Sequence, residues 1–121
     1  MVDYLPKFNP GAAATFTAAA DVIGGRLVAA VGDRLVEHTG ADDSRAIGVA
    51  GNDAAEGELV VVFTRAGGVH GLIPAGTILP GDKVTSAADG QVAALGAGSF
   101  PIGLALTGSS PTVATVDVLF V

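Results

Sequence analysis

The chain contains no cysteine and no tryptophan, and only 15% of its 121 residues are charged. Without cysteine it can form no disulfide, no cysteine-ligated metal centre and no thiolate nucleophile, and the redox compartment stays undecided. Its six lysine and arginine residues stand singly along the chain against twelve acidic ones, so the net charge is −6. Nucleic-acid binding requires clustered basic side chains that displace counterions from phosphates. The composition therefore argues against a nucleic-acid partner.

A long hydrophobic run is missing as well. The stretch Gly90–Val116 carries no charge, but glycines, two prolines and the pair Ser109-Ser110 interrupt it. A transmembrane helix requires about twenty predominantly apolar residues in a row. The first residues include Asp3 and Lys7 and lack the apolar segment of a signal peptide. We therefore expect no membrane partner and no secretory signal.

Glycine and apolar residues are abundant. The chain has 18 glycines, about twice the usual share of roughly 7%. Together with many β-branched residues, this composition is typical of short strands joined by tight turns. The length favours one domain. The mean hydropathy of +0.58 is high for a soluble monomer, so we expect another subunit or a partner to cover part of the apolar surface.

The first eleven residues read as an extended arm that precedes a single β domain at residues 12–121. Pro6 and Pro10 push the residues before them toward extended conformations. Tyr4, Leu5 and Phe8 offer three apolar anchors, and the alternative is a terminal tail that frays.

The stretch Gly67–Val84 organises the rest of the chain, because the segment after it resembles the segment before it. It predicts a short strand, a Pro-Ala-Gly turn, a second Pro-Gly turn and a new strand. Gly25-Arg26-Leu27-Val28 matches Gly81-Asp82-Lys83-Val84, and Ile47-Gly48-Val49-Ala50 matches Ile102-Gly103-Leu104-Ala105. This spacing predicts an internal pseudo-repeat with halves at about 22–66 and 78–121. Chance similarity between segments rich in glycine, alanine and valine is the alternative.

Hydrophobic patterning predicts about ten short strands and an all-β fold. The core of one of them, Leu59–Phe63, is apolar on both faces. Asp89-Gly90 is a hairpin signal between two others. Such strands, spaced 8–12 residues apart, are typical of a small barrel or sandwich. The expected ranges are 14–17, 26–31, 34–38, 46–50, 58–65, 69–73, 83–86, 91–95, 100–106 and 112–121.

No pattern of catalytic or ligand-binding residues is found. Ser99 lacks the glycine spacing of a nucleophile elbow, and the residues before Lys83 lack the order of a phosphate-binding loop. The oxygens of the Asn52–Glu58 loop lack the spacing of a calcium site, so we expect a solvated acidic loop. We expect His38 to be an exposed residue at a strand end and His70 to be structural. We therefore predict no enzyme, no cofactor and no metal.

Seven segments of the chain carry a resemblance by their order and spacing: 4–11, 24–28, 47–57, 67–70, 75–76, 80–82 and 102–105. Through them the sequence resembles the capsid decoration proteins of tailed bacteriophages, also called head-stabilising or capsid cement proteins. The similarity covers nearly the whole chain. It implies a small glycine-rich β-barrel or a β-clip or β-tulip-like domain, commonly trimeric, with no catalytic residues. It also implies a place in the virion, on the outer surface of the capsid.

The resemblance makes the major capsid protein the expected partner, besides further copies of the chain in a homotrimer. The expected function is to bridge capsid subunits and so stabilise the shell. The residues that we expect to contact the shell are Tyr4, Leu5, Pro6, Lys7 and Phe8.

A second, shorter resemblance leaves an alternative open. The segment Ile73–Asp82 is similar to the turn of β-clip domains of the antifreeze-like type, some of which bind sugars or act as assembly chaperones. Since it covers about ten residues, the match can report a shared fold without a shared function.

Overall fold

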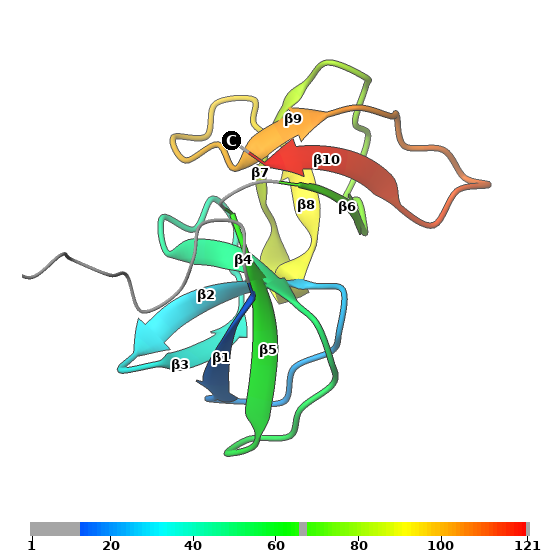
Figure 1. Ribbon diagram of the computed structural model, residues 1–121. Coiled ribbons are helices and arrows are strands. Elements are labelled where there is room, and N and C mark those ends of the chain that lie inside the picture. The colour runs from blue at the N-terminus through cyan, green and yellow to red at the C-terminus, as the bar shows by residue number, and fades with distance from the viewer. Residues whose placement is uncertain (1–12, 66–67, 121) are drawn as a thin grey trace, which may run out of the picture.

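The computed structural model describes residues 13–65 and 68–120 of the chain. This part is all-β, as predicted, and Figure 1 shows its strands gathered into two groups, β1 to β5 and β6 to β10. We call the first group the first unit and the second group the second unit. The strands are β1 (Ala13–Ala18), β2 (Leu27–Gly32), β3 (Leu35–His38), β4 (Ala46–Ala50), β5 (Leu59–Thr64), β6 (Val69–Leu72), β7 (Lys83–Ser86), β8 (Val92–Ala94), β9 (Gly103–Ala105) and β10 (Val116–Phe120), with one 3₁₀ turn, η1 (Ala88–Gly90).

All ten predicted strands are present, but the last two are shorter than expected. β9 begins only after Pro101, which has no N–H to donate to a ladder. β10 begins after a tight turn in which the Val113 amide donates to the Ser110 carbonyl. The two turns predicted at the centre of the chain are confirmed, because Gly76 and Gly81 adopt φ of 111° and 88°.

The first unit is a closed barrel with the strand order β1-β3-β2-β4-β5. β1 pairs in parallel with β3 and antiparallel with β5, so it closes the ring, and all other pairs are antiparallel. This closure leaves the barrel without a free strand edge.

The second unit has the strand order β6-β10-β9-β7-β8. Each of its strands has the same neighbours as the strand five places earlier in the chain, because the order is that of the first barrel read around the ring in the opposite direction. Its ring is closed more weakly, by residues 73–75. The amide of Val92 donates to the Ile73 carbonyl, and the Ala75 amide donates to the Val92 carbonyl. The parallel bridge between Pro74 and Val92 belongs to the same contact. These interactions in the second unit are the equivalent of the parallel pairing of β1 with β3 in the first unit.

Equivalent glycines mark the same place in both units. Gly48 faces Thr64 of β5, and Gly103 faces Phe120 of β10. A Cβ at either glycine would fall on a carbonyl oxygen of the facing strand, that of Phe63 or Leu119, so only glycine permits this close approach. Val28 pairs with Gly48 and Val84 pairs with Gly103, which gives offsets of 84 − 28 = 56 and 103 − 48 = 55 residues. The limits predicted for the arm, the domain and its two halves stay predictions, and the arm lies outside the described residues.

Two hydrophobic clusters form the core. The first fills the barrel with side chains such as Val28, Val60 and Val62. The second fills the second unit and also includes Leu27, Ala46 and Val49 of the first unit. Since Leu27 and Val49 face each other across β2 and β4, the second unit packs on the outer surface of that strand pair. Within the described residues, no helix is long and apolar enough to span a membrane.

Candidate docking surface

The residues predicted to contact the capsid shell, Tyr4, Leu5, Pro6, Lys7 and Phe8, lie outside the described residues. Their role stays a prediction. The described residues carry a different candidate surface, which begins on the outer side of β5.

Side chains of β5 alternate strictly between the barrel interior and its exterior. Val60 and Val62 are fully buried, whereas Leu59, Val61 and Phe63 are 68%, 38% and 44% exposed. The sequence showed that both faces of this strand are apolar, but residues 13–65 and 68–120 cover only its inner face. Exposed apolar side chains in a row mark interaction surfaces when they form a contiguous patch.

The outer side of the second unit carries a second group of exposed apolar side chains. Leu119 of β10 lies between Val69 of β6 and Leu104 of β9, and Lys83 of β7 follows Leu104 in the same row. Val69 and Leu119 are 52% and 37% exposed, and Leu104 is half-buried. Beyond Leu104 the surface is hollowed by a depression of about 310 Å³, which is lined by Lys83, Pro101, Gly103 and Leu104.

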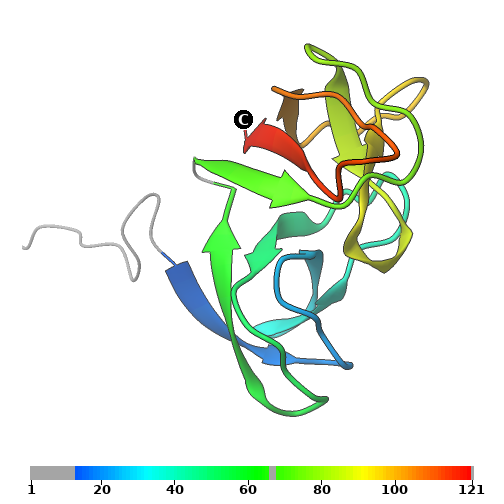
Figure 2. The ribbon, with the colours of Figure 1, turned by 90° about the vertical axis from the view of Figure 1, so that its right-hand side faces the viewer.

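At the junction of the units, the ring centroid of Phe63 lies 6.1 Å from that of His70. His70 pairs with the buried Val118 and so lies on the inner face of β6, opposite to Val69. Figure 2 shows β6 beginning close to the end of β5. The described residues thus carry two groups of exposed or half-buried apolar side chains: Leu59, Val61 and Phe63 on β5, and Val69, Leu104 and Leu119 on the second unit.

The sequence alone did not reveal these two groups of exposed side chains. The only signal in it was the uninterrupted apolar run of β5, and the other members come from strands that are adjacent only after folding.

Asp42 holds the two units together from the loop between β3 and β4. One of its carboxylate oxygens accepts hydrogen bonds from the amides of Ser99 (3.1 Å) and Phe100 (2.9 Å) and from the Thr85 hydroxyl (3.2 Å). The two amide bonds, and after them the Thr85 hydroxyl, lower the pKa of Asp42 despite partial desolvation. The charged form of Asp42 is therefore the form that this contact stabilises.

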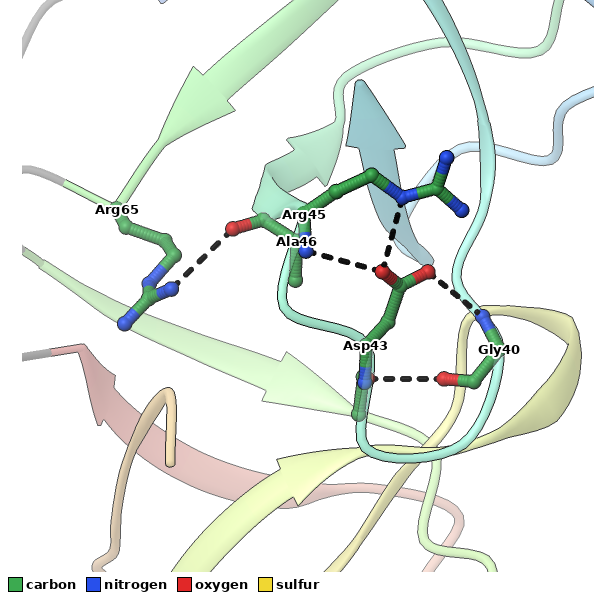
Figure 3. A network of polar contacts seen from close by, with 6 residues as sticks. Gly40, Asp43, Arg45, Ala46 and Arg65 are labelled. Atoms are coloured by element: carbon green, nitrogen blue, oxygen red, sulfur yellow. Dashed lines mark hydrogen bonds and ion pairs between the residues drawn. The ribbon is translucent and has the colours of Figure 1, made fainter. Parts of the chain in front are cut away.

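Asp43 orders the same loop (Figure 3). Its carboxylate accepts hydrogen bonds from the amides of Gly40 (3.2 Å) and Arg45 (2.9 Å), and the Arg45 side chain lies 3.5 Å away. Burial works against the charge, but these hydrogen bonds and Arg45 outweigh it and lower the pKa of Asp43. In the same view, Arg65 donates to the Ala46 carbonyl, and it also donates to the Pro101 carbonyl of the second unit.

The expectation that His38 is exposed is wrong. His38 is half-buried, and its Nε2 accepts a hydrogen bond from the Ile23 amide at 3.0 Å. Burial, and after it the charge of Arg26, lowers the pKa of His38. The pattern around His38 could not show this, because Ile23 is 15 residues away in sequence.

His70 is half-buried between two aromatic rings, those of Phe63 and Phe120, and its centroid lies 5.0 Å from that of Phe120. This position at the junction of the two units agrees with a structural role.

The polar side chains of the acidic loop, Asn52, Asp53, Glu56 and Glu58, are exposed, as expected for a solvated loop, and several of them also accept hydrogen bonds. Asp53 accepts a hydrogen bond from the Gly24 amide, Asn52 accepts one from the Val61 amide, and Glu58 accepts one from the Ala55 amide. These side chains therefore satisfy backbone donors of neighbouring segments. Among the residues that the structure describes, no three histidine or acidic side chains gather into a group that could hold a metal ion.

A surface for docking on an all-β scaffold agrees with what is known of similar proteins. The family model described as phage cement protein matches residues 8–120. The chain belongs to the phage cement protein family. The resemblance to capsid decoration proteins is thereby confirmed, and the chain is a capsid-associated structural protein.

A solved structure supports the fold assignment for this member of the family. The head fiber gp8.5 N base of bacteriophage phi29 matches with a TM-score of 0.71 and 23% sequence identity. The match covers 91% of this chain and 93% of that one. At this identity it shows that the fold is shared and no more. No curated protein matches the chain.

Proposed function

We propose that this protein decorates the exterior of a phage capsid as a homotrimer and stabilises the shell by bridging major capsid subunits, without enzymatic activity or a cofactor. The observation that carries the proposal is the family match over residues 8–120, which includes every described residue. The name of the phi29 structure, a head fiber base, describes a component of a phage head, which agrees with a place in the virion.

The mechanism is mechanical. A partner that binds only the assembled lattice stabilises it by RT ln(1 + [L]/Kd), about 2.7 kcal/mol per site at a hundredfold excess over Kd. Each copy adds such a term, and a shell offers many equivalent sites. The sum opposes the separation of capsid subunits under internal pressure without any chemical step.

The segment that we propose for contact with the shell is the N-terminal arm, through Tyr4, Leu5, Pro6, Lys7 and Phe8. In the sequence, the arm precedes both predicted halves of the repeat and belongs to neither. Full burial of Leu5 or Phe8 would contribute about 1.5–3 kcal/mol each, less the entropy lost when the arm becomes ordered.

The test is to add the purified protein to undecorated phage particles and image them by electron microscopy. We expect density on the outer surface that touches more than one major capsid subunit. Heated side by side, decorated particles should retain their DNA to a higher temperature than bare particles. Loss of DNA at the same temperature would show that the stabilising role is wrong.

A further inference from the structure

We infer that the outer side of the second unit binds the turn at residues 32–34 of a second copy of this chain, in a head-to-tail contact. The inference rests on the proposed decoration by a homo-oligomer and names the two surfaces that would join its copies. It repeats, between chains, the contact by which the second unit packs on the first unit of its own chain.

Within the chain, the turn η1 of the second unit binds the first unit near the start of β2 and the end of β3. The Arg26 side chain donates to the Asp89 carbonyl at 3.0 Å. The Gly90 amide donates to the Thr39 carbonyl. Thr39 and Leu27, which lie under this contact, are 2% and 0% exposed. The first unit therefore has a docking site for a turn of the same fold.

The second unit has the equivalent site, and the described residues leave it open. Three residues of the second unit stand 56 positions after three residues of the contact just described (82 − 26 = 56). The pairs are Arg26 and Asp82, Leu27 and Lys83, and Thr39 and Leu95. The Leu95 amide donates to the Lys83 carbonyl, as the Thr39 amide donates to the Leu27 carbonyl. We call the depression of about 370 Å³ at this place the Asp82 depression, and its lining residues are Asp82, Lys83, Ala94, Leu95 and Gly96.

The depression of about 310 Å³ beside Leu104 extends the equivalence to the apolar part of the contact. In the first unit the counterparts Leu27 and Val49 are 0% and 4% exposed, because the second unit packs on them. In the second unit Lys83 is exposed and Leu104 is half-buried. The described residues thus cover this face in the first unit and leave the equivalent face of the second unit uncovered.

The segment that fits this face is the counterpart of η1 in the first unit, residues 32–34. Gly90 is buried where the units meet, whereas its counterpart Arg34 is exposed. Arg34 lies over the ring of Phe16, which is half-buried, whereas the counterpart of Phe16, Leu72, is 0% exposed. Each copy therefore carries one uncovered turn and one uncovered docking site, and a second copy can supply what each of them lacks.

The residues that differ between the two sites favour pairing between chains. A Cβ at Gly90 would be 2.7 Å from the Leu27 carbonyl oxygen and 2.8 Å from the Arg26 Cβ, so the site in the first unit admits no side chain. Between copies, Arg34 takes the place of Gly90 and Asp82 takes the place of Arg26. The turn of the second copy therefore lies less deep than η1 does, and it brings a guanidinium to a carboxylate.

The charges beside this pair are also balanced. Lys83 follows Asp82 in the docking site, and Asp33 precedes Arg34 in the turn, so each surface carries one charge of either sign. Two chains of net charge −6 repel each other at a distance. A contact in which each surface is locally neutral and the signs can alternate reduces that repulsion where the copies meet.

Such a contact is heterologous, because different surfaces of the two copies meet, and it forms a closed ring when the rotation between copies closes. In a ring of three copies, six units would follow one another, joined alternately within and between chains. The contact between chains lacks the connection made by Asp42, because residues 95–101 of the second unit contain no acidic residue. We therefore expect it to be weaker than the contact within the chain and to depend on protein concentration.

The test uses sedimentation velocity on the full chain without phage particles. Arg34→Asp and Asp82→Arg each place like charges in the contact, and the double variant Arg34→Asp/Asp82→Arg restores opposite charges. The control Glu56→Arg makes the same change of charge as Asp82→Arg at an exposed position of the acidic loop. We expect the wild type, the control and the double variant to form the same oligomer, and each single variant to associate at least about tenfold more weakly. A monomeric wild type, or a double variant that associates no better than the single variants, would overturn the inference.

A second measurement keeps the charge pair of the contact intact. Because the chain has no cysteine, Lys83→Cys and Ile23→Cys each introduce a single thiol. Lys83 lines both depressions. Ile23 is 49% exposed, and its counterpart Leu79 stays 60% exposed beside the contact within the chain. We expect maleimide labelling of the Lys83→Cys protein to slow as protein concentration rises and labelling of the Ile23→Cys protein to stay constant.

Equal labelling rates of the Lys83→Cys protein at all concentrations would contradict the inference. If that thiol is protected only when undecorated particles are added, the shell covers the outer side of the second unit. That result overturns the contact between copies and leaves the proposed decoration of the capsid standing.

Discussion

Asp42 adopts φ of 47° in the loop between β3 and β4, and it reaches amides that are 57 and 58 positions away in sequence. A positive φ is unfavourable for most residues, and aspartate is among those that tolerate it best. At this position the backbone turns the carboxylate toward Ser99 and Phe100 of the second unit. Side chains such as that of Asp42 thus add contacts between the two units. The chain itself connects the units only once, between β5 and β6.

Acid should weaken this connection. Because folding lowers the pKa of Asp42 below its ordinary value of 3.8, the unfolded chain binds a proton more readily than the folded one near and below that pH. The stability contributed by Asp42 is therefore present above about pH 4 and is lost as the pH falls through its folded pKa. We expect the melting temperature of Asp42→Asn to fall less than that of the wild type between pH 5 and pH 2.

The control for this experiment is Asp33→Asn, which removes the same charge from an exposed turn. Its pH profile should follow that of the wild type. Identical profiles for wild type and Asp42→Asn would show that the Asp42 carboxylate does not stabilise the folded state through its charge.

At the scale of elements, the turn η1 between β7 and β8 brings the second unit into contact with β2 and β3. This turn follows the prediction from Asp89-Gly90: both residues have positive φ, 58° and 71°, and the Gln91 amide donates to the Ala88 carbonyl. The turn then fits between Arg26, whose Nη1 donates to the Asp89 carbonyl, and Thr39, whose carbonyl accepts from the Gly90 amide. The turn chemistry is local, whereas the contact depends on the packing of the units.

Gly90→Ala should therefore be more destabilising than a glycine substitution that only strains the backbone. Gly96 also has a positive φ, 51°, but a Cβ there would meet no atom within 4 Å. We expect Gly96→Ala to cost about 1 kcal/mol and Gly90→Ala roughly 1–3 kcal/mol more, because its Cβ overlaps backbone that cannot move aside easily. Urea unfolding of both variants measures the difference, and equal losses would contradict the proposed contact.

The N-terminal arm is the element that we expect to be dispensable for folding. Deletion of residues 1–10 removes no residue of the ten strands, so the truncated chain should unfold near the wild-type temperature. It should bind undecorated particles much more weakly in a co-sedimentation assay, because the proposed anchors Tyr4, Leu5 and Phe8 are gone. A truncated chain that unfolds, or that binds as tightly as the full chain, would show that the arm is not the anchor.

At the scale of the whole molecule, net charge and surface chemistry decide how binding responds to salt. The chain carries −6 and has only six basic residues, among which Lys7 belongs to the proposed arm contact. If the shell is bound mainly through apolar and backbone groups, few ion pairs are available for salt to screen. We expect the affinity for undecorated particles to change little between about 50 and 300 mM salt.

The variant Lys7→Gln tests whether the positive charge of the proposed arm contact contributes to binding. It should lower the affinity slightly and remove what salt dependence remains. A steep loss of decoration between low and moderate salt would mean that charge pairs hold the protein on the shell.

The amino-acid sequence by itself determined the positions of the ten strands and the class of the fold. Runs of β-branched residues favour strands, and glycine, proline and Asp-Gly favour turns. Because these preferences act over a few residues, local signals such as Asp89-Gly90 were sufficient to predict where strands end and turns begin. The order of short motifs along the chain also carried the resemblance to the cement family, which the family match confirms. Both kinds of information are read along the chain and need no knowledge of which strands become neighbours.

Only the tertiary structure decided which surfaces are covered. The outer faces of β2 and of β5 are both apolar, but the second unit covers Leu27 and leaves Leu59 exposed. The partner of His38 is likewise a backbone group from a distant segment, and the partners of Asp42 come from the other unit. Burial and hydrogen bonding at these positions depend on how the barrel closes and how the two units pack, and those contacts join residues far apart in sequence.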